Sequence, residues 1–218
     1  MSSHHASDRR AEGSAPTTAE LEKSKLYSEE IGLDLAKGGE RDLFLWFLAS
    51  QLFGQPISEE IARRTFHAFV DHGLTTPTKI LDAGWNTLVN PIMREGGYVR
   101  YDESKSRSIL NTCQMLVDRY DGKVSRIHAD AEGSRDLEAR LKEFTGFGPV
   151  TVEIFLRDVR PFWPKADTPP GTELRKLARR FRVDLDAYDH QSLQFARVQS
   201  GLIRLRHKAP PSRRRGGA

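Results

Sequence analysis

Apolar residues recur every three or four positions along most of the chain, which is the period of an α-helix. Residues 40–53 differ, because they are apolar on nearly every side, and this predicts a helix buried at the centre of a bundle. Pro56 and Ser58 predict the start of a second helix, which Gly73 ends. Further helices are predicted over 77–83, 85–94, 102–120, 134–144, 149–158, 169–181 and 189–203.

Strand signals are missing from the sequence. No alternating run of β-branched residues flanks a tight Asn-Gly or Asp-Gly turn. The connections between the predicted helices are short, as they are in a compact bundle. The sequence therefore predicts an all-α protein.

Charge is distributed unevenly over the 218 residues, which include 34 Lys and Arg and 30 Asp and Glu. Residues 204–218 hold six basic residues and no acid, so the positive excess belongs to this tail. Such a tail suits a polyanion such as nucleic acid, and equally a solubilising end without a partner. Residues 1–20 are polar and lack periodicity. We expect disordered tails at 1–20 and 206–218 around one folded domain at 21–205.

The composition also argues against several classes of protein. No run of about 18 apolar residues is long enough to span a membrane, and the N-terminus lacks the apolar segment of a secretion signal. Cys113 is the only cysteine, which excludes an internal disulfide, a four-cysteine zinc site and a cysteine-ligated iron–sulfur cluster. We expect an intracellular protein with no metal site and no membrane partner.

The most informative stretch is the predicted helical hairpin at about 137–158. Gly146 and Gly148 let the backbone turn sharply and approach a ligand closely, and Pro149 then opens a helix. The start of a helix offers unpaired N–H groups and a partial positive charge, which together suit a phosphate. A plain turn between two helices has the same pattern.

Four segments of the chain resemble segments of the helix–hairpin–helix (HhH-GPD) DNA glycosylase superfamily, and in particular of its endonuclease III-like members. They follow one another along the chain in the same order as in that family. Residues 144–152 resemble the family hairpin, L-P-G-V-G-x-K-T-A, and residues 166–168, Ala-Asp-Thr, resemble its V-D-T-H segment. Upstream, residues 47–51 resemble the L-L-S-A-Q helix, and residues 104–124 resemble S-K-A-x-x-I-x-x-T-C followed by N-G-x-V-P. The resemblance spans about residues 30–182.

Two departures from the family pattern affect the chemistry that the resemblance implies. Val150 stands where bifunctional members carry the lysine that forms a Schiff base, and valine is not a nucleophile. Pro169 stands where the family has histidine after the Asp-Thr pair. The cluster cysteines of many relatives are also missing. The resemblance therefore implies a monofunctional enzyme without a lyase step, without an iron–sulfur cluster and without another cofactor; lyase activity through a different amine is the less favoured alternative.

The resemblance also implies a role for each matched residue. Asp167 would stabilise the positive charge that develops on the sugar and would orient the attacking water. Gln51 would fill the hole left by a flipped base, and Tyr98 or Tyr101, in a glycine-rich loop, would stack as a wedge. The hairpin would hold a phosphate through the residues Gly146, Phe147, Gly148, Val150 and Thr151.

Each of these residues has a plainer structural interpretation. Asp167 is placed to cap the helix predicted at 169–181. Gln51 is also a polar residue at the end of a buried helix, and either tyrosine is also an ordinary surface aromatic. Five aromatic residues could line a base pocket, although a stripe of Phe and Trp more often belongs to the hydrophobic core: Phe44, Trp46, Phe47, Phe162 and Trp163.

The resemblance implies two helical subdomains with a DNA-binding cleft between them. One is a barrel over about 40–160, and the other joins the N-terminal helix to the C-terminal helices. The implied function is base-excision DNA repair: an N-glycosylase, which is a hydrolase, flips and removes a damaged or mismatched base. We expect a monomer on lesion-containing double-stranded DNA, cytoplasmic and associated with the nucleoid in a bacterium. The alternative is a non-catalytic DNA-binding protein that keeps the hairpin. Uracil, oxidised pyrimidines, alkylated purines and mismatched thymine all remain open as the target.

Overall fold

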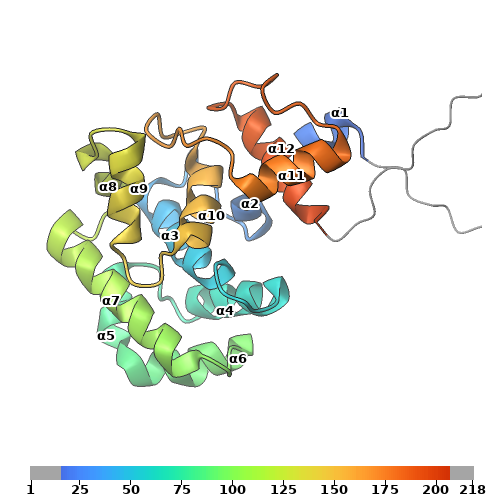
Figure 1. Ribbon diagram of the computed structural model, residues 1–218. Coiled ribbons are helices and arrows are strands. Elements are labelled where there is room, and N and C mark those ends of the chain that lie inside the picture. The colour runs from blue at the N-terminus through green and yellow to red at the C-terminus, as the bar shows by residue number, and fades with distance from the viewer. Residues whose placement is uncertain (1–15, 207–218) are drawn as a thin grey trace, which may run out of the picture.

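The computed structural model describes residues 16–206, which fold into helices without a strand (Figure 1). The prediction of an all-α fold is confirmed for these residues. None of the helices in this part of the chain has the length and apolar character that crossing a membrane requires. The expectations for residues 1–15 and for the basic tail from 207 onward lie outside the described residues.

The first helices lie where the sequence gave weak signals. Helix α1 (Thr18–Glu22) falls partly inside the segment expected to be a tail, so that expectation is corrected for residues 16–20. A capping box forms this helix: the Glu20 N–H donates to Thr17 Oγ1 at 3.3 Å, and the Thr17 N–H donates to the Glu20 carboxylate at 2.6 Å. Leu21 is buried. The four-residue helix α2 (Tyr27–Glu30) follows and was not predicted.

The central helices largely follow the sequence pattern. Helix α3 (Gly39–Phe53) is the buried central helix, and Ser58 caps helix α4 (Glu59–Asp71) as expected. Thr76 caps helix α5 (Pro77–Thr87), because the backbone N–H of Lys79 donates to the Thr76 side chain. The chain continues through the π-helical turn η1 (Leu88–Met93), the short α6 (Arg94–Gly96) and the long α7 (Asp102–Tyr120).

The second half of the chain contains α8 (Val124–Asp130), which was not predicted, then α9 (Ser134–Lys142) and α10 (Pro149–Val159). Helices α11 (Thr172–Phe181) and α12 (Leu193–Arg204) end the described chain. Helix α11 begins at Thr172, three residues after the predicted start, and its N-cap is Gly171. The interpretation of Asp167 as the cap of α11 is therefore wrong.

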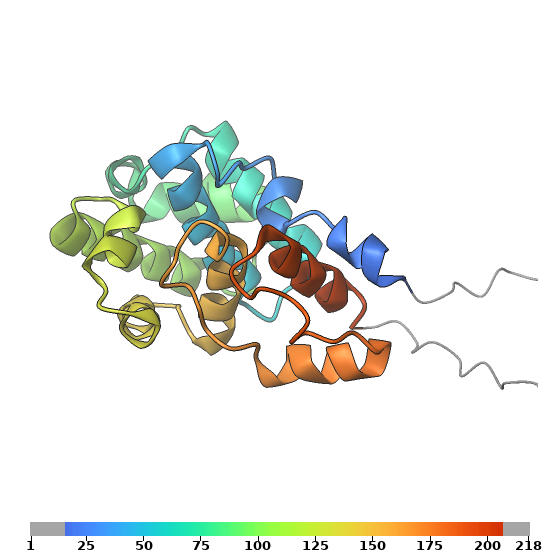
Figure 2. The same ribbon diagram turned by 90° about the horizontal axis from the view of Figure 1, so that it is seen from above.

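Buried apolar side chains gather into two clusters. The larger one surrounds α3 and reaches from Tyr27 to Ala166, while the smaller one joins Leu21 of α1 to α11 and α12. The expected grouping of the N-terminal helix with the C-terminal helices agrees with the smaller cluster, and α1 lies beside α12 in Figures 1 and 2. The smaller cluster consists of Leu21, Leu174, Ala178, Phe181, Leu185, Phe195, Val198, Leu202 and Leu205.

Phe47 fixes the position of the α9–α10 turn against the central helix. Its ring centroid lies 5.2 Å from that of Phe144, 4.2 Å from that of Phe147 and 5.3 Å from that of Phe155. Aromatic pairs at these separations attract beyond their area burial. The hydrophobic core therefore holds both ends of the turn, so the turn cannot move independently of α3.

Candidate nucleic-acid interface

The turn between α9 and α10 needs glycine at Gly146. This residue has a φ of +85°, which L side chains rarely adopt. A Cβ atom here would also lie 2.6 Å from Ser108 Oγ and 2.7 Å from Gln51 Nε2. Gly148 differs, because its φ is −71° and an added Cβ would meet no atom within 4 Å. Gly146 thus serves the internal packing, whereas Gly148 faces open space.

Where α10 begins, backbone N–H groups lack hydrogen-bond acceptors among the described residues. Pro149 occupies the first helical position, and the first N–H to bond back along the chain is that of Val152, to the Gly148 carbonyl at 3.0 Å. Between residues 16 and 206 no acceptor is found for the N–H groups of Gly148, Val150 and Thr151. Residues 148–150 are exposed. The turn therefore offers free donors at the positive end of a helix dipole, which is suited to a phosphate.

Gln51 supports this turn from inside the protein. Its side chain is fully buried, and Nε2 donates to the Thr145 carbonyl at 2.7 Å and to Ser108 Oγ at 2.8 Å. Ser108 and Thr112 donate to the same carbonyl, each at 3.0 Å. Gln51 Oε1 is buried without a hydrogen-bond partner in the described chain. In this conformation Gln51 holds the turn in place and does not lie on the surface that DNA would contact.

A buried lysine lies directly behind Gln51. Lys105 is 4% exposed, and its Nζ donates to the Gln51 backbone carbonyl at 3.0 Å. Burial lowers the pKa of this lysine to about 8, because the charged form is poorly solvated. Lys105 of α7 thus holds the backbone of Gln51 at the end of α3, and the side chain of Gln51 in turn holds the turn before α10.

The remaining hairpin residues divide between core and surface. Phe147 is buried, and so is Thr151, whose Oγ1 donates to the Gly146 carbonyl at 3.2 Å. Thr151 also packs closely on Gly54, where an added Cβ would lie 2.0 Å from Oγ1. Val150 is 60% exposed. Only its side chain, together with the backbone of the turn, is placed to contact a ligand directly.

The two tyrosines of the glycine-rich loop have different positions. Tyr98 is 1% exposed, so it is not available as a stacking wedge in this conformation. Tyr101 is 38% exposed and lies just before α7, with the Arg100 guanidinium carbon 5.3 Å from its ring centroid. Of the two, Tyr101 is the one that a nucleic acid can reach.

Asp167 lies in the loop between α10 and α11, with its side chain 56% exposed and 3.6 Å from Arg160. Arg160 is buried, and its Nη atoms donate to the carbonyls of Thr168 at 2.7 Å and His190 at 3.2 Å. Burial lowers the pKa of Arg160, and the carboxylates of Asp167 and Glu153 act in the opposite direction. Arg160 therefore fixes the loop that presents Asp167.

Lys165 is bound elsewhere, although it is close to Asp167 in sequence. Its Nζ donates to the backbone carbonyls of His128 at 2.8 Å and Ala129 at 3.0 Å, both in α8. The Lys165 N–H donates to His128 Nε2 at 3.2 Å. Burial, with a smaller contribution from Lys165, lowers the pKa of His128. The amine is held by α8, which does not favour a role for it beside Asp167.

A cavity of about 440 Å³ opens along α10, one turn after the exposed Val150. Ile154, four residues later on the same helical face, lines it together with Tyr27 of α2 and Phe53 of α3. Asp167 does not line it. A smaller hollow beside it shares the lining residue Arg157 and is bounded by residues 168–171. The loop that carries Asp167 thus adjoins this region.

Sequence reasoning missed this cavity, because its lining comes from distant parts of the chain: α2, the end of α3 with the following connection and α4, α10, and the end of α12. The one local signal was Arg157, an arginine within the apolar pattern of α10. The aromatic residues expected to line a base pocket are instead mainly core: Phe44, Trp46, Phe47 and Trp163 are buried, and Phe162 is half-buried. Their interpretation as core residues is confirmed.

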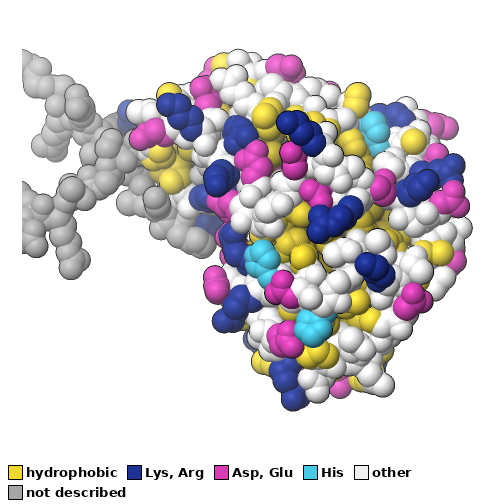
Figure 3. All heavy atoms as spheres, turned by 180° about the vertical axis from the view of Figure 1, so that it is seen from behind, with side chains coloured by type: hydrophobic (Ala, Val, Ile, Leu, Met, Phe, Trp, Pro, Cys, Tyr) yellow, Lys and Arg dark blue, Asp and Glu magenta, His cyan; other side chains and the backbone are white. Residues whose placement is uncertain are grey.

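Helix α11 carries a concentrated basic surface that the sequence analysis did not single out. Leu174, Ala178 and Phe181 face the core, and five exposed cations lie in and just after the helix. Seen from above, α9, α10 and α11 lie along the same edge of the molecule (Figure 2). On the opposite face, cations and anions are interspersed (Figure 3). The five cations are Arg175, Lys176, Arg179, Arg180 and Arg182.

No group of three or more His, Cys, Asp or Glu residues within 16–206 is arranged to hold a metal ion. Cys113 is buried, and burial raises the pKa of its thiol. Comparison with known proteins identifies no relative, since no family model, no curated protein and no solved structure matches this chain.

Proposed function

We propose that this protein is a monofunctional DNA N-glycosylase that grips duplex DNA with the α9–α10 turn. The observation that carries the proposal is the turn itself: free N–H groups at an exposed helix start, braced internally by Gln51. The resemblance of residues 144–152 and 166–168 to the helix–hairpin–helix glycosylases supports it. In this proposal the turn is the helix–hairpin–helix motif, and the adjoining cavity is part of the DNA-binding cleft.

Each part of the candidate interface has a task in this proposal. The turn binds a backbone phosphate, which sets the register of the protein on DNA without reading sequence. The target base leaves the stack at a cost of a few kcal/mol and enters the cavity beyond Val150. The cations of α11 contact further phosphates and add affinity that falls with salt.

Asp167 supplies the chemistry. Cleavage of the N-glycosidic bond builds positive charge on the sugar, and a carboxylate beside C1′ stabilises that charge. The same carboxylate orients water for attack. The Arg160–Asp167 ion pair holds the carboxylate in the free protein, and the exposure of the Asp167 side chain leaves it accessible for contact with substrate.

A specific observation favours the alternative of a non-catalytic DNA-binding protein. Asp167 is exposed, pairs with Arg160 and does not line the cavity that would receive a base. A protein that only binds DNA needs the turn and α11 but no carboxylate at a base pocket. The two functions differ in turnover and not in affinity.

An excision assay on a panel of duplexes separates them. Duplexes carrying uracil, an oxidised pyrimidine, an alkylated purine or mismatched thymine are incubated with the protein, and abasic product is revealed by alkaline cleavage. Binding is followed in parallel by fluorescence anisotropy. Excision of any of these bases supports the glycosylase. Binding without excision supports the alternative, and the absence of both contradicts each function.

A further inference from the structure

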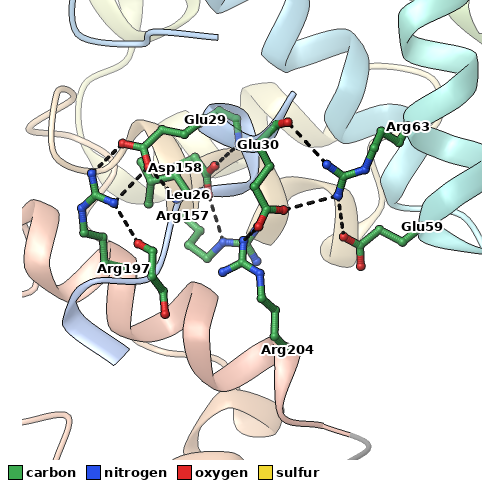
Figure 4. Close-up of polar contacts among 11 residues, drawn as sticks. Leu26, Glu29, Glu30, Glu59, Arg63, Arg157, Asp158, Arg197 and Arg204 are labelled. Carbon is green, nitrogen blue, oxygen red and sulfur yellow. Dashed lines mark hydrogen bonds and ion pairs between the residues drawn. The ribbon is translucent and has the colours of Figure 1, made fainter. Parts of the chain in front are cut away.

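The cavity beside α10 contains a buried arginine with unused donors. Arg157 is 5% exposed, and its Nε donates to Asp158 Oδ1 at 3.0 Å (Figure 4). Asp158 Oδ2 accepts the Ser28 N–H at 2.9 Å, so both oxygens of this carboxylate are occupied. Within residues 16–206 the Nη atoms of Arg157 make no hydrogen bond. Asp158 thus orients the Arg157 guanidinium. The Nη atoms of Arg157 stay available at the cavity wall.

Tyr27 presents a second unused donor at the same cavity. The guanidinium carbons of Arg157 and Arg204 lie 4.7 Å and 4.3 Å from its ring centroid. Its hydroxyl makes no hydrogen bond to another residue within 16–206. Burial raises the pKa of Tyr27, so the hydroxyl keeps its proton at neutral pH. Both unused groups are therefore able to donate a hydrogen bond to a ligand.

The carboxylates around the cavity are already engaged. Glu59 lines it, and its Oε1 lies 3.1 Å from Arg63. Glu30 pairs with Arg63 at 3.3 Å and with Arg204 at 2.9 Å (Figure 4). A ligand in the cavity therefore meets free guanidinium and phenol donors, while the nearby negative charge is committed to other cations.

This network also fixes α2 between α10 and α12. Arg197 of α12 donates to both carboxylate oxygens of Glu29, at 2.9 Å and 2.6 Å. Bidentate pairs of this kind restrict geometry more than single contacts do. The unused donors of Arg157 and Tyr27 are consequently held in position before a ligand arrives.

We propose that this cavity selects a neutral base that presents carbonyl oxygens, of the uracil type, and rejects cationic N-alkylated purines. The proposal rests on the glycosylase function and names its substrate class. Carbonyl oxygens accept from guanidinium and phenol donors, and the rings of Tyr27 and Phe53 provide aromatic surface for a flat ligand. A cationic base would instead meet the poorly solvated Arg157, where like charges repel strongly.

The test compares duplexes that carry uracil or 7-methylguanine, in cleavable form and as non-cleavable 2′-fluoroarabino analogues. Excision rates are measured on the first pair and dissociation constants on the second, relative to an undamaged duplex. We expect uracil to be excised and bound in preference to 7-methylguanine. Equal or better excision of 7-methylguanine overturns the inference while the glycosylase function stands. Selective binding of the uracil analogue without any excision supports the cavity assignment and contradicts the catalytic function.

Two variants connect the selectivity to the residues. Tyr27→Phe removes an oxygen that makes no hydrogen bond within residues 16–206, so folding is preserved, and we expect uracil-analogue affinity to fall roughly threefold to tenfold. Arg157→Lys keeps the charge beside Asp158 and removes the planar donor edge, for an expected loss of about tenfold. Tyr120→Phe, at a buried tyrosine of the larger core, is the matched control. Wild-type selectivity in both cavity variants overturns the inference.

Discussion

The side-chain amide of Gln51 donates to the carbonyl oxygen of Thr145 at 2.7 Å, although the two residues lie 94 positions apart in the chain. This bond joins the end of α3 to the α9–α10 turn. The resemblance implied that Gln51 acts on DNA directly, whereas its full burial gives it an internal task. Its influence on DNA binding therefore passes through the geometry of the turn.

Replacing Gln51 by alanine should lower the free energy of unfolding by about 1–3 kcal/mol, because buried partners lose their hydrogen bonds. Duplex affinity should fall with it, since the turn loses a support. Chemical denaturation and fluorescence anisotropy measure the two effects. Gln114→Ala, at an exposed glutamine of α7, is the control. A loss of affinity with unchanged stability would instead indicate direct contact between Gln51 and DNA.

Gly148→Asp tests the phosphate site at the turn without disturbing the fold. An added side chain meets no atom within 4 Å, and aspartate is a favourable N-cap for α10. Stability should therefore be retained, while the new negative charge repels phosphate and weakens duplex binding.

Gly148→Asn is the matched control, because it caps equally well and adds no charge. We expect its affinity to stay close to that of the wild type at low salt. Equal affinity of the Asp and Asn variants, measured by anisotropy at low salt, would show that no phosphate binds beside residue 148.

Prediction from the sequence succeeded where local signals were strong. Helices α7 and α10 follow from uninterrupted periodicity, and Pro149 fixes the start of α10 at the first helical position. It failed at α11, because Thr168 and Pro169 have the composition of a helix start while the chain continues to Gly171 before it coils. Short helices such as α2 and α8 are stabilised by tertiary packing that a local pattern does not contain.

The candidate site was predictable only in part, and for a different reason. The glycine turn is local, so residues 146–148 were identified from the sequence. Whether a polar side chain at a helix end faces solvent or the interior depends on distant partners, as Gln51 and Thr145 demonstrate. The cavity around Arg157 brings together four separate parts of the chain, and no short motif encodes it.

Lys105 should make stability depend on pH in the alkaline range. Its pKa in the folded protein is about 8, below the usual 10.5, so between these values the unfolded chain binds more protons. Stability contributed by this residue therefore rises with pH from about 8 to 10.5, by roughly 3 kcal/mol at most. Lys105→Met should remove this rise in denaturation curves across that range. The exposed Lys79→Met should leave it intact, and an unchanged rise in Lys105→Met would contradict the assignment.

Because residue 150 is a valine, we expect the wild-type protein to leave the abasic strand uncut after it removes the base. A lyase of this type needs an amine that attacks C1′, and valine has none. Val150→Lys should give some borohydride-trapped adduct on the excised duplex, because residue 150 is exposed at the start of α10, next to the cavity. Efficient trapping by the wild-type protein would contradict the monofunctional mechanism and direct attention to another amine.

The most direct test of the glycosylase mechanism is the single-turnover excision rate of Asp167→Asn on the duplex that the wild type cleaves best. The N-cap of α11 is Gly171, so this substitution removes no cap, and it replaces an exposed side chain. Asp186→Asn, at another exposed aspartate, is the control, and binding to an abasic-site duplex is measured for all three proteins. We predict a loss of excision on the order of a hundredfold or more in Asp167→Asn alone, with duplex binding retained. An Asp167→Asn protein that excises the base at the wild-type rate would contradict the assignment of Asp167 as the catalytic carboxylate.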